Sequence, residues 1–388
     1  MRPRLGFGVF LAPHHPIGES PTLQFQRDLD LATWLDDLGY DEFWVGEHHS
    51  AGWETIASPE MFLVAAAERT KRIRLGTGVV SIPYHHPFNS AQRIVMLDHL
   101  SRGRAMLGVG PGALPSDAAM LGIDPMTQRE RMDEGLGVIL RLLKSEEPVT
   151  AKGDWYELRD ASLHLRPLQE EIPVAVASTI SPSGMKTAGK YGVGVLSIAS
   201  YSEEGLQALP TQWNFGEVSA REHGQQIDRA NWRIVMPFHL SDSKEQAYRE
   251  VAAGLKRWQN EYIIGILGTP MRTPFDDGYA AAKFMDERGG AILGTPEDAL
   301  EKLAKLDQMS GGFGTVLSFA HDWATREQTL KSYELIARYV MPKVQGQLLS
   351  IEASAARVKA NKEKLMQGAT GAIMKAIHDF NATHPRKK

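Results

Sequence analysis

The chain has 388 residues, of which 43% are hydrophobic and 23% charged, a composition that excludes a disordered, collagen-like or disulfide-stapled protein. Lysine and arginine number 43 against 47 aspartate and glutamate, so the net charge of −4 favours neither nucleic acid nor an anionic membrane as a partner. The absence of cysteine excludes disulfides and thiolate metal ligands and fits a cytoplasmic location, and no stretch approaches the ~20 apolar residues that cross a bilayer.

Short apolar runs alternate with longer amphipathic segments along most of the chain, which is typical of βα units around a parallel sheet. We predict eight strands, over residues 5–11, 42–46, 73–77, 105–109, 173–177, 194–198, 232–240 and 314–319. Eight such units predict a closed (β/α)8 TIM barrel over residues 1–342, with its active site at the carboxyl ends of the strands. An open doubly wound sheet is the alternative.

Three segments depart from the simple repeat. Residues 148–167 predict a β-hairpin after the fourth helix, with its turn near Gly153. Residues 265–290 hold many glycines and prolines and predict a mobile lid after the seventh helix. Residues 343–388 predict a C-terminal helical tail of one or two helices between Val344 and Asn381.

Three tandem histidine pairs each follow one of the first three predicted strands, so their loops should open on one rim of the barrel. They are His14-His15, His48-His49 and His85-His86. A structural interpretation is that each pair holds one buried imidazole bonded to backbone and one solvated imidazole.

A metal-dependent hydrolase barrel using these histidines and Asp322 is a further alternative. Adjacent residues on a strand point to opposite faces, however, so a tandem pair offers one inward ligand. We therefore expect no metal.

Closely spaced glycines end the fourth predicted strand, at Gly110 and Gly112. The segment lacks the Gly-x-Gly-x-x-Gly spacing of a dinucleotide-binding fold. The glycines instead favour close approach of backbone to a flat ligand, with a tight turn as the structural alternative.

Hydroxyl side chains cluster where the fifth predicted strand runs into a helix, at Ser178, Thr179, Ser181 and Ser183. Free backbone amides at a helix N-terminus bind anions, and four hydroxyls exceed what helix capping requires. The segment predicts a phosphate site, and the chain has neither a P-loop nor a Gly-x-Ser-x-Gly motif.

Several motifs together resemble the bacterial luciferase-like flavin-dependent monooxygenases, most closely the limonene 1,2-monooxygenase type. The resemblance runs from about Leu5 to Pro342. Its motifs lie at residues 38–50 (ending Gly-Glu-His-His-Ser), 73–79, 86–87, 97–98, 101–104, 294–297 (Gly-Thr-Pro-Glu) and 340–342.

The resemblance implies a two-component enzyme that takes reduced FMN from a separate NAD(P)H-dependent flavin reductase. The reduced flavin would react with O2 to a C4a-hydroperoxide that transfers one oxygen atom to a small apolar organic substrate. Epoxidation of an alkene or terpene such as limonene is the first expectation, with Baeyer–Villiger oxidation and hydroxylation open. A deazaflavin (F420)-dependent oxidoreductase is the alternative within the same superfamily, and relatives are commonly homo-oligomers, as dimers or tetramers.

The resemblance also assigns roles to residues. His48 would hold or protonate the peroxide, and Gly110 and Gly112 would lie by the flavin ring. A non-proline cis peptide is implied at Gly78-Val79, and Pro111 stands where luciferase has a phosphate-binding arginine. The phosphate would be held by Ser178, Thr179, Ser181, Ser183, Gly184 and Met185, and the substrate pocket would be lined by Phe10, Trp53, Met61, Tyr84 and Met236.

Overall fold

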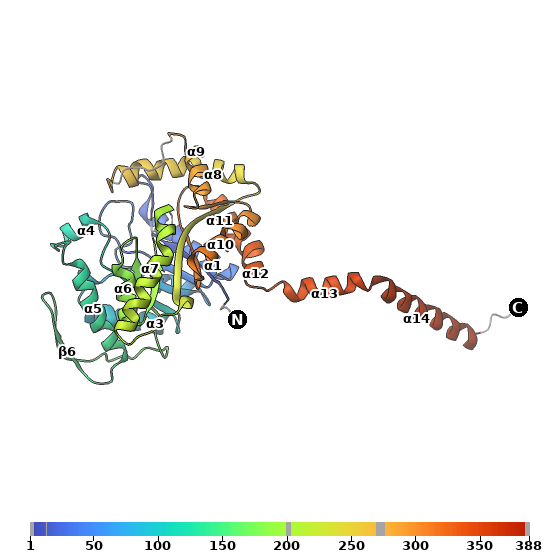
Figure 1. The fold of residues 1–388 in the computed structure, drawn as a ribbon, viewed down its shortest axis with the longest axis horizontal. Helices are drawn as coiled ribbons and strands as arrows, with labels where there is room; N and C mark the ends of the chain where they lie inside the picture. Colours follow the sequence, from blue (N-terminus) through green and yellow to red (C-terminus); the bar gives the residue numbers. More distant parts are fainter. Residues whose placement is uncertain (1–3, 13, 199–202, 269–275, 385–388) are drawn as a thin grey trace. The chain divides into compact units, whose positions relative to one another are not determined.

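The computed structural model describes residues 4–12, 14–198, 203–268 and 276–384. Its central element is a closed barrel of parallel strands, in which β10 pairs with β9 and completes the circle (Figure 1). In barrel order the strands are β1 (Gly6–Leu11), β2 (Glu42–Val45), β3 (Arg74–Thr77), β5 (Ala105–Gly110), β8 (Val174–Ser178), β9 (Gly194–Ser197), β10 (Trp232–Leu240) and β12 (Thr315–Phe319). The eight-stranded barrel and all eight predicted strand positions are confirmed.

Helices connect successive strands around the barrel. They are α1 (Pro21–Leu38), α2 (Pro59–Arg69), α3 (Pro87–Leu100), α4 (Pro115–Met120), α5 (Gln128–Lys144), α6 (Ser183–Tyr191), α7 (Glu203–Glu222), α8 (Lys244–Arg257), α9 (Gly278–Glu287), α10 (Pro296–Ser310) and α11 (Arg326–Leu335). The shorter elements are β4 (Val80–Ser81), η1 (Ile82–Tyr84), η2 (Arg229–Asn231), β11 (Ile292–Gly294), η4 (Ile336–Val340) and α12 (Met341–Val344).

Local sequence explains where many of these elements begin. The barrel strands are buried and mostly apolar on both faces because one face meets the interior and the other meets the helices. Helices α10 and α11 each begin at a capping box, in which Thr295 pairs with Asp298 and Thr325 with Gln328. Proline at the first helical position begins several others, including α1 after Ser20.

A large aromatic side chain fills the barrel interior below the strand ends. Trp44 is fully buried there, and a Cβ added at Gly76 would lie 2.4 Å from its ring. Only glycine therefore leaves room for Trp44 at this position of β3. The indole also donates to Glu42, which forms a buried ion pair with Arg233.

The predicted hairpin is confirmed as β6 (Val149–Lys152) paired antiparallel with β7 (Glu157–Ala161), and the amide of Gly153 donates to the carbonyl of Tyr156 in its turn. The predicted lid segment is partly helical. It follows the π-helix η3 (Trp258–Ile264) and includes α9, while residues 269–275 lie outside the described residues.

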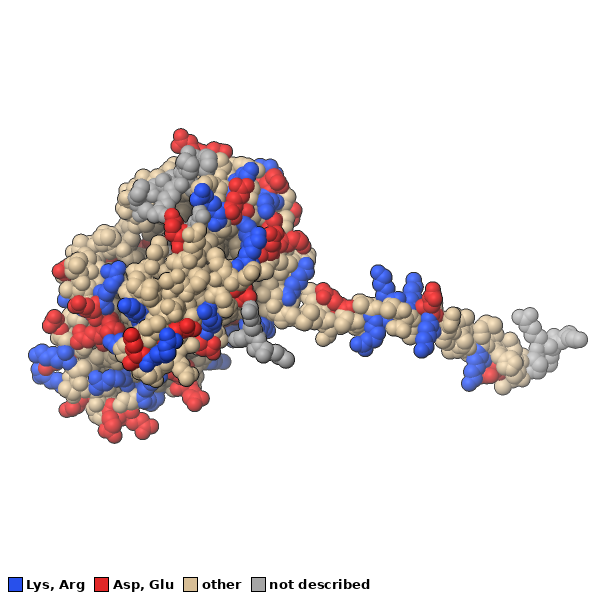
Figure 2. All heavy atoms as spheres, viewed as in Figure 1, with Lys and Arg blue, Asp and Glu red and all other residues tan. Residues whose placement is uncertain are grey.

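The chain divides into two compact units, Met1–Met341 and Pro342–Lys388. In the second unit, α13 (Leu349–Ala360) and α14 (Lys362–Thr383) are helical, as predicted for this tail. In the part of the chain that the structure describes, no helix has the length and apolarity needed to span a membrane. Acidic and basic side chains are interspersed on the face of the molecule shown in Figure 2.

Candidate active site

A cavity of about 530 Å³ lies at the carboxyl ends of the barrel strands. Its walls come from the loops after β1, β2, β3, β5 and β8, from the end of β12 and from η3. The residues that line it include Phe10, Ala12, His14, Glu47, His48, Glu54, Gly78, Val79, Pro111, Gly112, Arg129, Thr179, Ser181, Ser183, Gly184, Trp258, Tyr262, Ile263, Leu267 and Phe319.

His48 lies in this wall with a carboxylate at each ring nitrogen. Its Nδ1 is 3.0 Å from Oδ2 of Asp117, and its Nε2 is 3.1 Å from Oε2 of Glu54. Burial opposes the charged imidazolium, but Glu54 and Asp117 outweigh it and raise the pKa of His48. The side chain is therefore held by a hydrogen bond to Asp117 and an ion pair with Glu54.

Glu54 is the second carboxylate of this cluster and is almost fully buried. An isolated β-bridge between His14 and Glu54 sets the two residues side by side, with His14 Nε2 3.4 Å from Glu54 Oε1. The hydroxyl of Tyr262 donates to the same oxygen. Burial opposes ionisation, but His14, His48 and Tyr262 together lower the pKa of Glu54 to about 2.

Glu47, on the same rim, forms hydrogen bonds with two further histidines. Its Oε1 accepts from Nε2 of His49 (2.8 Å) and Nε2 of His85 (2.5 Å), and its Oε2 accepts from the amide of Ser81 (2.6 Å). Glu47, His49 and His85 each place one nitrogen or oxygen atom within 4.8 Å of those of the other two. The hydrogen bonds to Glu47 connect the loops after β2 and β3.

The expected convergence of the three histidine pairs on one rim is confirmed, but their partners differ from the structural interpretation. His14 and His48, from the first two pairs, both lie beside Glu54. His49 and His85 both contact Glu47. Carboxylates, rather than backbone groups, therefore bind these imidazoles. In the third pair, His86 accepts from the amide of Phe88 and caps α3.

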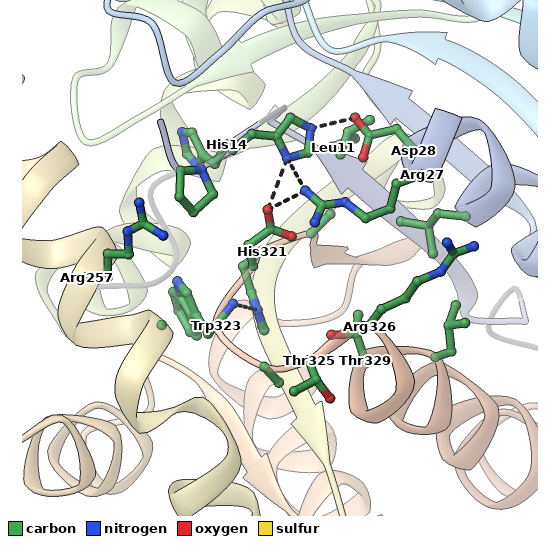
Figure 3. Close-up of a pocket in the computed structure, with 18 of the residues that line it drawn as sticks. Leu11, His14, Arg27, Asp28, Arg257, His321, Trp323, Thr325, Arg326 and Thr329 are labelled. Atoms are coloured by element: carbon green, nitrogen blue, oxygen red, sulfur yellow. Dashed lines mark hydrogen bonds and ion pairs between the residues drawn. The ribbon is translucent and has the colours of Figure 1, made fainter. Parts of the chain in front are cut away.

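A second cavity of about 490 Å³ lies between α1, α8 and α11, and His14 lines both cavities (Figure 3). In its wall, His15 lies between Asp28 (Nε2 to Oδ2, 2.8 Å) and Asp322 (Nδ1 to Oδ2, 3.0 Å). Arg27 also donates to Asp322, at 2.6 Å. Burial alone would lower the pKa of His15, but the two carboxylates raise it to about 9.

One end of the main cavity is suited to an anion. Thr179, Ser181, Ser183 and Gly184 line it at the N-terminus of α6, where no side chain caps the free amides. A Cβ at Gly184 would lie 2.3 Å from the carbonyl oxygen of Ala177, so glycine is required for α6 to approach β8 this closely. This end of the cavity combines free amide donors with hydroxyl groups.

Arg129, in the first turn of α5, lines the same cavity. It is exposed, and among the residues described here it forms no ion pair. Pro111 stands where an arginine was expected, and Arg129 was not among the predicted site residues. The available signal was an arginine at the start of the second helix after the glycine-rich loop.

The other walls of the cavity are mainly apolar. The segment η3 contributes Trp258, Tyr262 and Ile263, and Phe319 and Phe10 come from the ends of β12 and β1. This composition suits an organic molecule with a largely apolar body.

Two of the five residues predicted to line a substrate pocket lie elsewhere. Met61 is 76% exposed because α2 presents it to solvent. Met236 faces away from the interior because its neighbour Val235 packs into the barrel core, and alternate residues of a strand face opposite sides. Both predictions were wrong.

The other three predicted substrate residues are closer to the cavity. Phe10 lines it. Trp53 lies behind the wall, with its ring 5.5 Å from that of Tyr262. Tyr84 supports the glycine-rich loop, since a Cβ at Gly112 would lie 2.2 Å from its hydroxyl oxygen.

The predicted flavin residues also divide into lining and supporting positions. The peptide between Gly78 and Val79 is cis, as expected, and both residues line the cavity together with Gly112. Gly110, Ser178 and Met185 are not lining residues. Gly110 packs against Val79, where a Cβ would meet the side chain at 2.6 Å, and Ser178 and Met185 are buried within the β8–α6 unit.

These features define a TIM-barrel enzyme site at the strand ends, with free helix amides at one end, an apolar wall and a histidine between two carboxylates. The model of the luciferase-like monooxygenase family matches residues 5–312, and the chain belongs to this family. It is an oxygenase, and the family assignment replaces the metal-dependent hydrolase alternative.

Among the relatives that match most of the chain, two share about half of its residues. It is 50% identical over 355 residues to 4-hydroxyprotoasukamycin monooxygenase of Streptomyces nodosus subsp. asukaensis, covering 90% of this chain and 95% of that protein. It is 47% identical over 352 residues to limonene 1,2-monooxygenase of Rhodococcus erythropolis, covering 89% and 88%. Among solved structures, the oxygenating constituent of 3,6-diketocamphane monooxygenase of Pseudomonas putida, in complex with FMN, matches with a TM-score of 0.74 and 28% identity, over 88% of this chain and 98% of that one.

Proposed function

We propose that this protein is the oxygenase component of a two-component, FMN-dependent monooxygenase. The observation that carries the proposal is that a single cavity joins an anion-binding helix N-terminus to an apolar chamber containing His48. The named activities of the relatives and the FMN complex of the similar structure support it. When bound, reduced FMN activates O2 and supplies one oxygen atom to the substrate, the other leaving as water.

The FMN phosphate fits the end of the cavity formed by Thr179, Ser181, Ser183 and the amide of Gly184, with Arg129 as the cation. The flavin ring fits the glycine-lined floor at Gly112, where backbone is close to the cavity. Few of the described lining residues are cations, which suits a protein that receives reduced FMN from an NAD(P)H-dependent reductase and releases oxidised FMN after each turnover.

The remaining apolar space fits a small organic substrate under Trp258, Ile263 and Phe319. The surrounding aromatic and aliphatic groups exclude water from the reacting atoms, and His48 supplies a hydrogen-bond donor next to them. Epoxidation of an alkene, as in a terpene such as limonene, is the favoured reaction, and Baeyer–Villiger oxidation is the second. We place the enzyme in the cytoplasm as a homo-oligomer.

A single-turnover experiment tests the proposal. The protein is loaded anaerobically with photoreduced FMN and mixed with ¹⁸O2 in the presence of limonene or a cyclic ketone, and products are identified by mass spectrometry. One ¹⁸O atom in an epoxide or a lactone is expected. If no substrate gains ¹⁸O and the protein binds coenzyme F420 in preference to FMN, the deazaflavin alternative replaces the proposal.

A further inference from the structure

Both ring nitrogens of His48 have a carboxylate partner, which limits how this residue can reach a ligand. Nδ1 of His48 forms a hydrogen bond with Asp117, and Nε2 forms an ion pair with Glu54. Glu54 lines the cavity and Asp117 is not among its lining residues, so Nε2 is the nitrogen on the cavity side. For His48 to donate to a ligand oxygen, its Nε2–H must leave Glu54.

Glu54 has other donors that remain when this happens. Its Oε2 lies 3.1 Å from Nε2 of His48 in an ion pair, whereas its Oε1 accepts from the hydroxyl of Tyr262 and lies 3.4 Å from Nε2 of His14. A carboxylate accepts about four hydrogen bonds. If the His48 contact is lost, the buried Glu54 carboxylate therefore still has Tyr262 and His14 as donors. It avoids the free-energy cost of a buried, unpaired charge.

The donors come from distant parts of the chain. His14 follows β1, and its imidazole packs against Tyr262 with 4.5 Å between ring centroids. Tyr262 belongs to η3, which also supplies Trp258 and Ile263 to the cavity wall. Tyr262 can therefore hold Glu54 only while η3 covers the cavity.

We propose that Glu54 is a positioning residue that holds the Nε2–H of His48 and, kept in place by Tyr262 and His14, releases it to an oxygen atom of the bound ligand. Asp117 then keeps the imidazole oriented through Nδ1. The second half of this role rests on the proposed function, because the ligand is taken to be FMN.

The first test uses ligand-free protein with ¹⁵N-labelled histidine, in which the His48 resonances are assigned by their loss in His48→Gln. In Glu54→Gln we expect the pKa of His48 to fall by at least about 1, because one of its two adjacent anions is removed. Asp117, Glu47 and His49, the other groups that act on His48, remain. Glu60→Gln is the matched control, because Glu60 is equally buried on α2 but outside the cavity.

A folded Glu54→Gln protein in which His48 titrates as in the wild type overturns the proposal. If that variant does not fold, Tyr262→Phe takes its place. Removing a competing donor strengthens the ion pair between Glu54 and His48, so the pKa of His48 rises, and an unchanged or lower value counts against the role.

The second test adds oxidised FMN. In the wild type, FMN is expected to shift the Nε2 resonance of His48, and in Tyr262→Phe this shift becomes smaller because Glu54 retains His48. Equal shifts in both proteins contradict the release step. Failure of the wild type to bind FMN contradicts the proposed function instead, and the ligand-free measurement still decides whether Glu54 positions His48.

Discussion

Arg233 and Glu42 form a buried, two-bond ion pair across the barrel interior, with Nε to Oε2 at 2.7 Å and Nη2 to Oε1 at 2.8 Å. The residues come from β10 and β2, which are not neighbours in the barrel. The guanidinium also lies 5.1 Å from the centroid of Trp44, whose indole donates to Glu42. This network closes the barrel beneath the active-site cavity.

Removing one charge of this pair should strongly destabilise the fold. Arg233→Met leaves Glu42 buried without its cation, and we expect the free energy of unfolding to fall by about 3–5 kcal/mol in denaturant titrations. Arg326→Met is the control, because Arg326 pairs with Asp30 at an exposed position worth about 0–1 kcal/mol. Equal effects of the two substitutions would contradict the interpretation of the buried pair.

The position of Arg129 predicts a phosphate-specific effect. Arg129→Gln should weaken FMN binding by about 10- to 100-fold, since a hydrogen bond to a charged group contributes about 1.5–3 kcal/mol. Riboflavin lacks the phosphate, so its affinity should not change. Arg131→Gln, two residues further along α5 and outside the cavity lining, is the control. The comparison requires flavin fluorescence titrations only, and equal losses for FMN and riboflavin would place Arg129 away from the phosphate.

Gly184 predicts a steric effect on the same end of the cavity. Gly184→Ala should displace the N-terminus of α6, because the added Cβ meets the backbone of Ala177 and cannot be accommodated by a side-chain movement. We expect a loss of about 1–3 kcal/mol in stability and weaker FMN binding by about tenfold or more. Gly371→Ala, on α14 with no atom within 4 Å of the added Cβ, should instead be neutral or stabilising by up to about 1 kcal/mol.

The cluster around His15 predicts a pH dependence of stability. The pKa of His15 is raised to about 9 from 6.5, so its contribution is complete below pH 6.5 and is lost as the pH rises through 9. We expect the wild type to lose about 2–3 kcal/mol of unfolding free energy between these values relative to His15→Gln. Parallel stability curves for the two proteins across this range would show that His15 is neutral in the folded state.

Much of this protein follows from local sequence. The eight strands, the hairpin and the tail helices were predicted correctly because apolar runs, turn residues and helical periodicity depend on near neighbours. The rim position of the three histidine pairs followed from strand order alone, since all parallel strands of a barrel end on one face.

The partners of those histidines were decided only by the tertiary structure. Glu54 meets His14, His48 and Tyr262 because the loops after β1 and β2 come together with η3 over the barrel, and no spacing along the chain encodes that approach. The same holds for Met236, whose outward orientation depends on the register of β10, and for Arg129, which reaches the cavity from the start of α5. Local patterns determine which elements form, whereas the contacts between side chains from distant elements depend on how those elements pack.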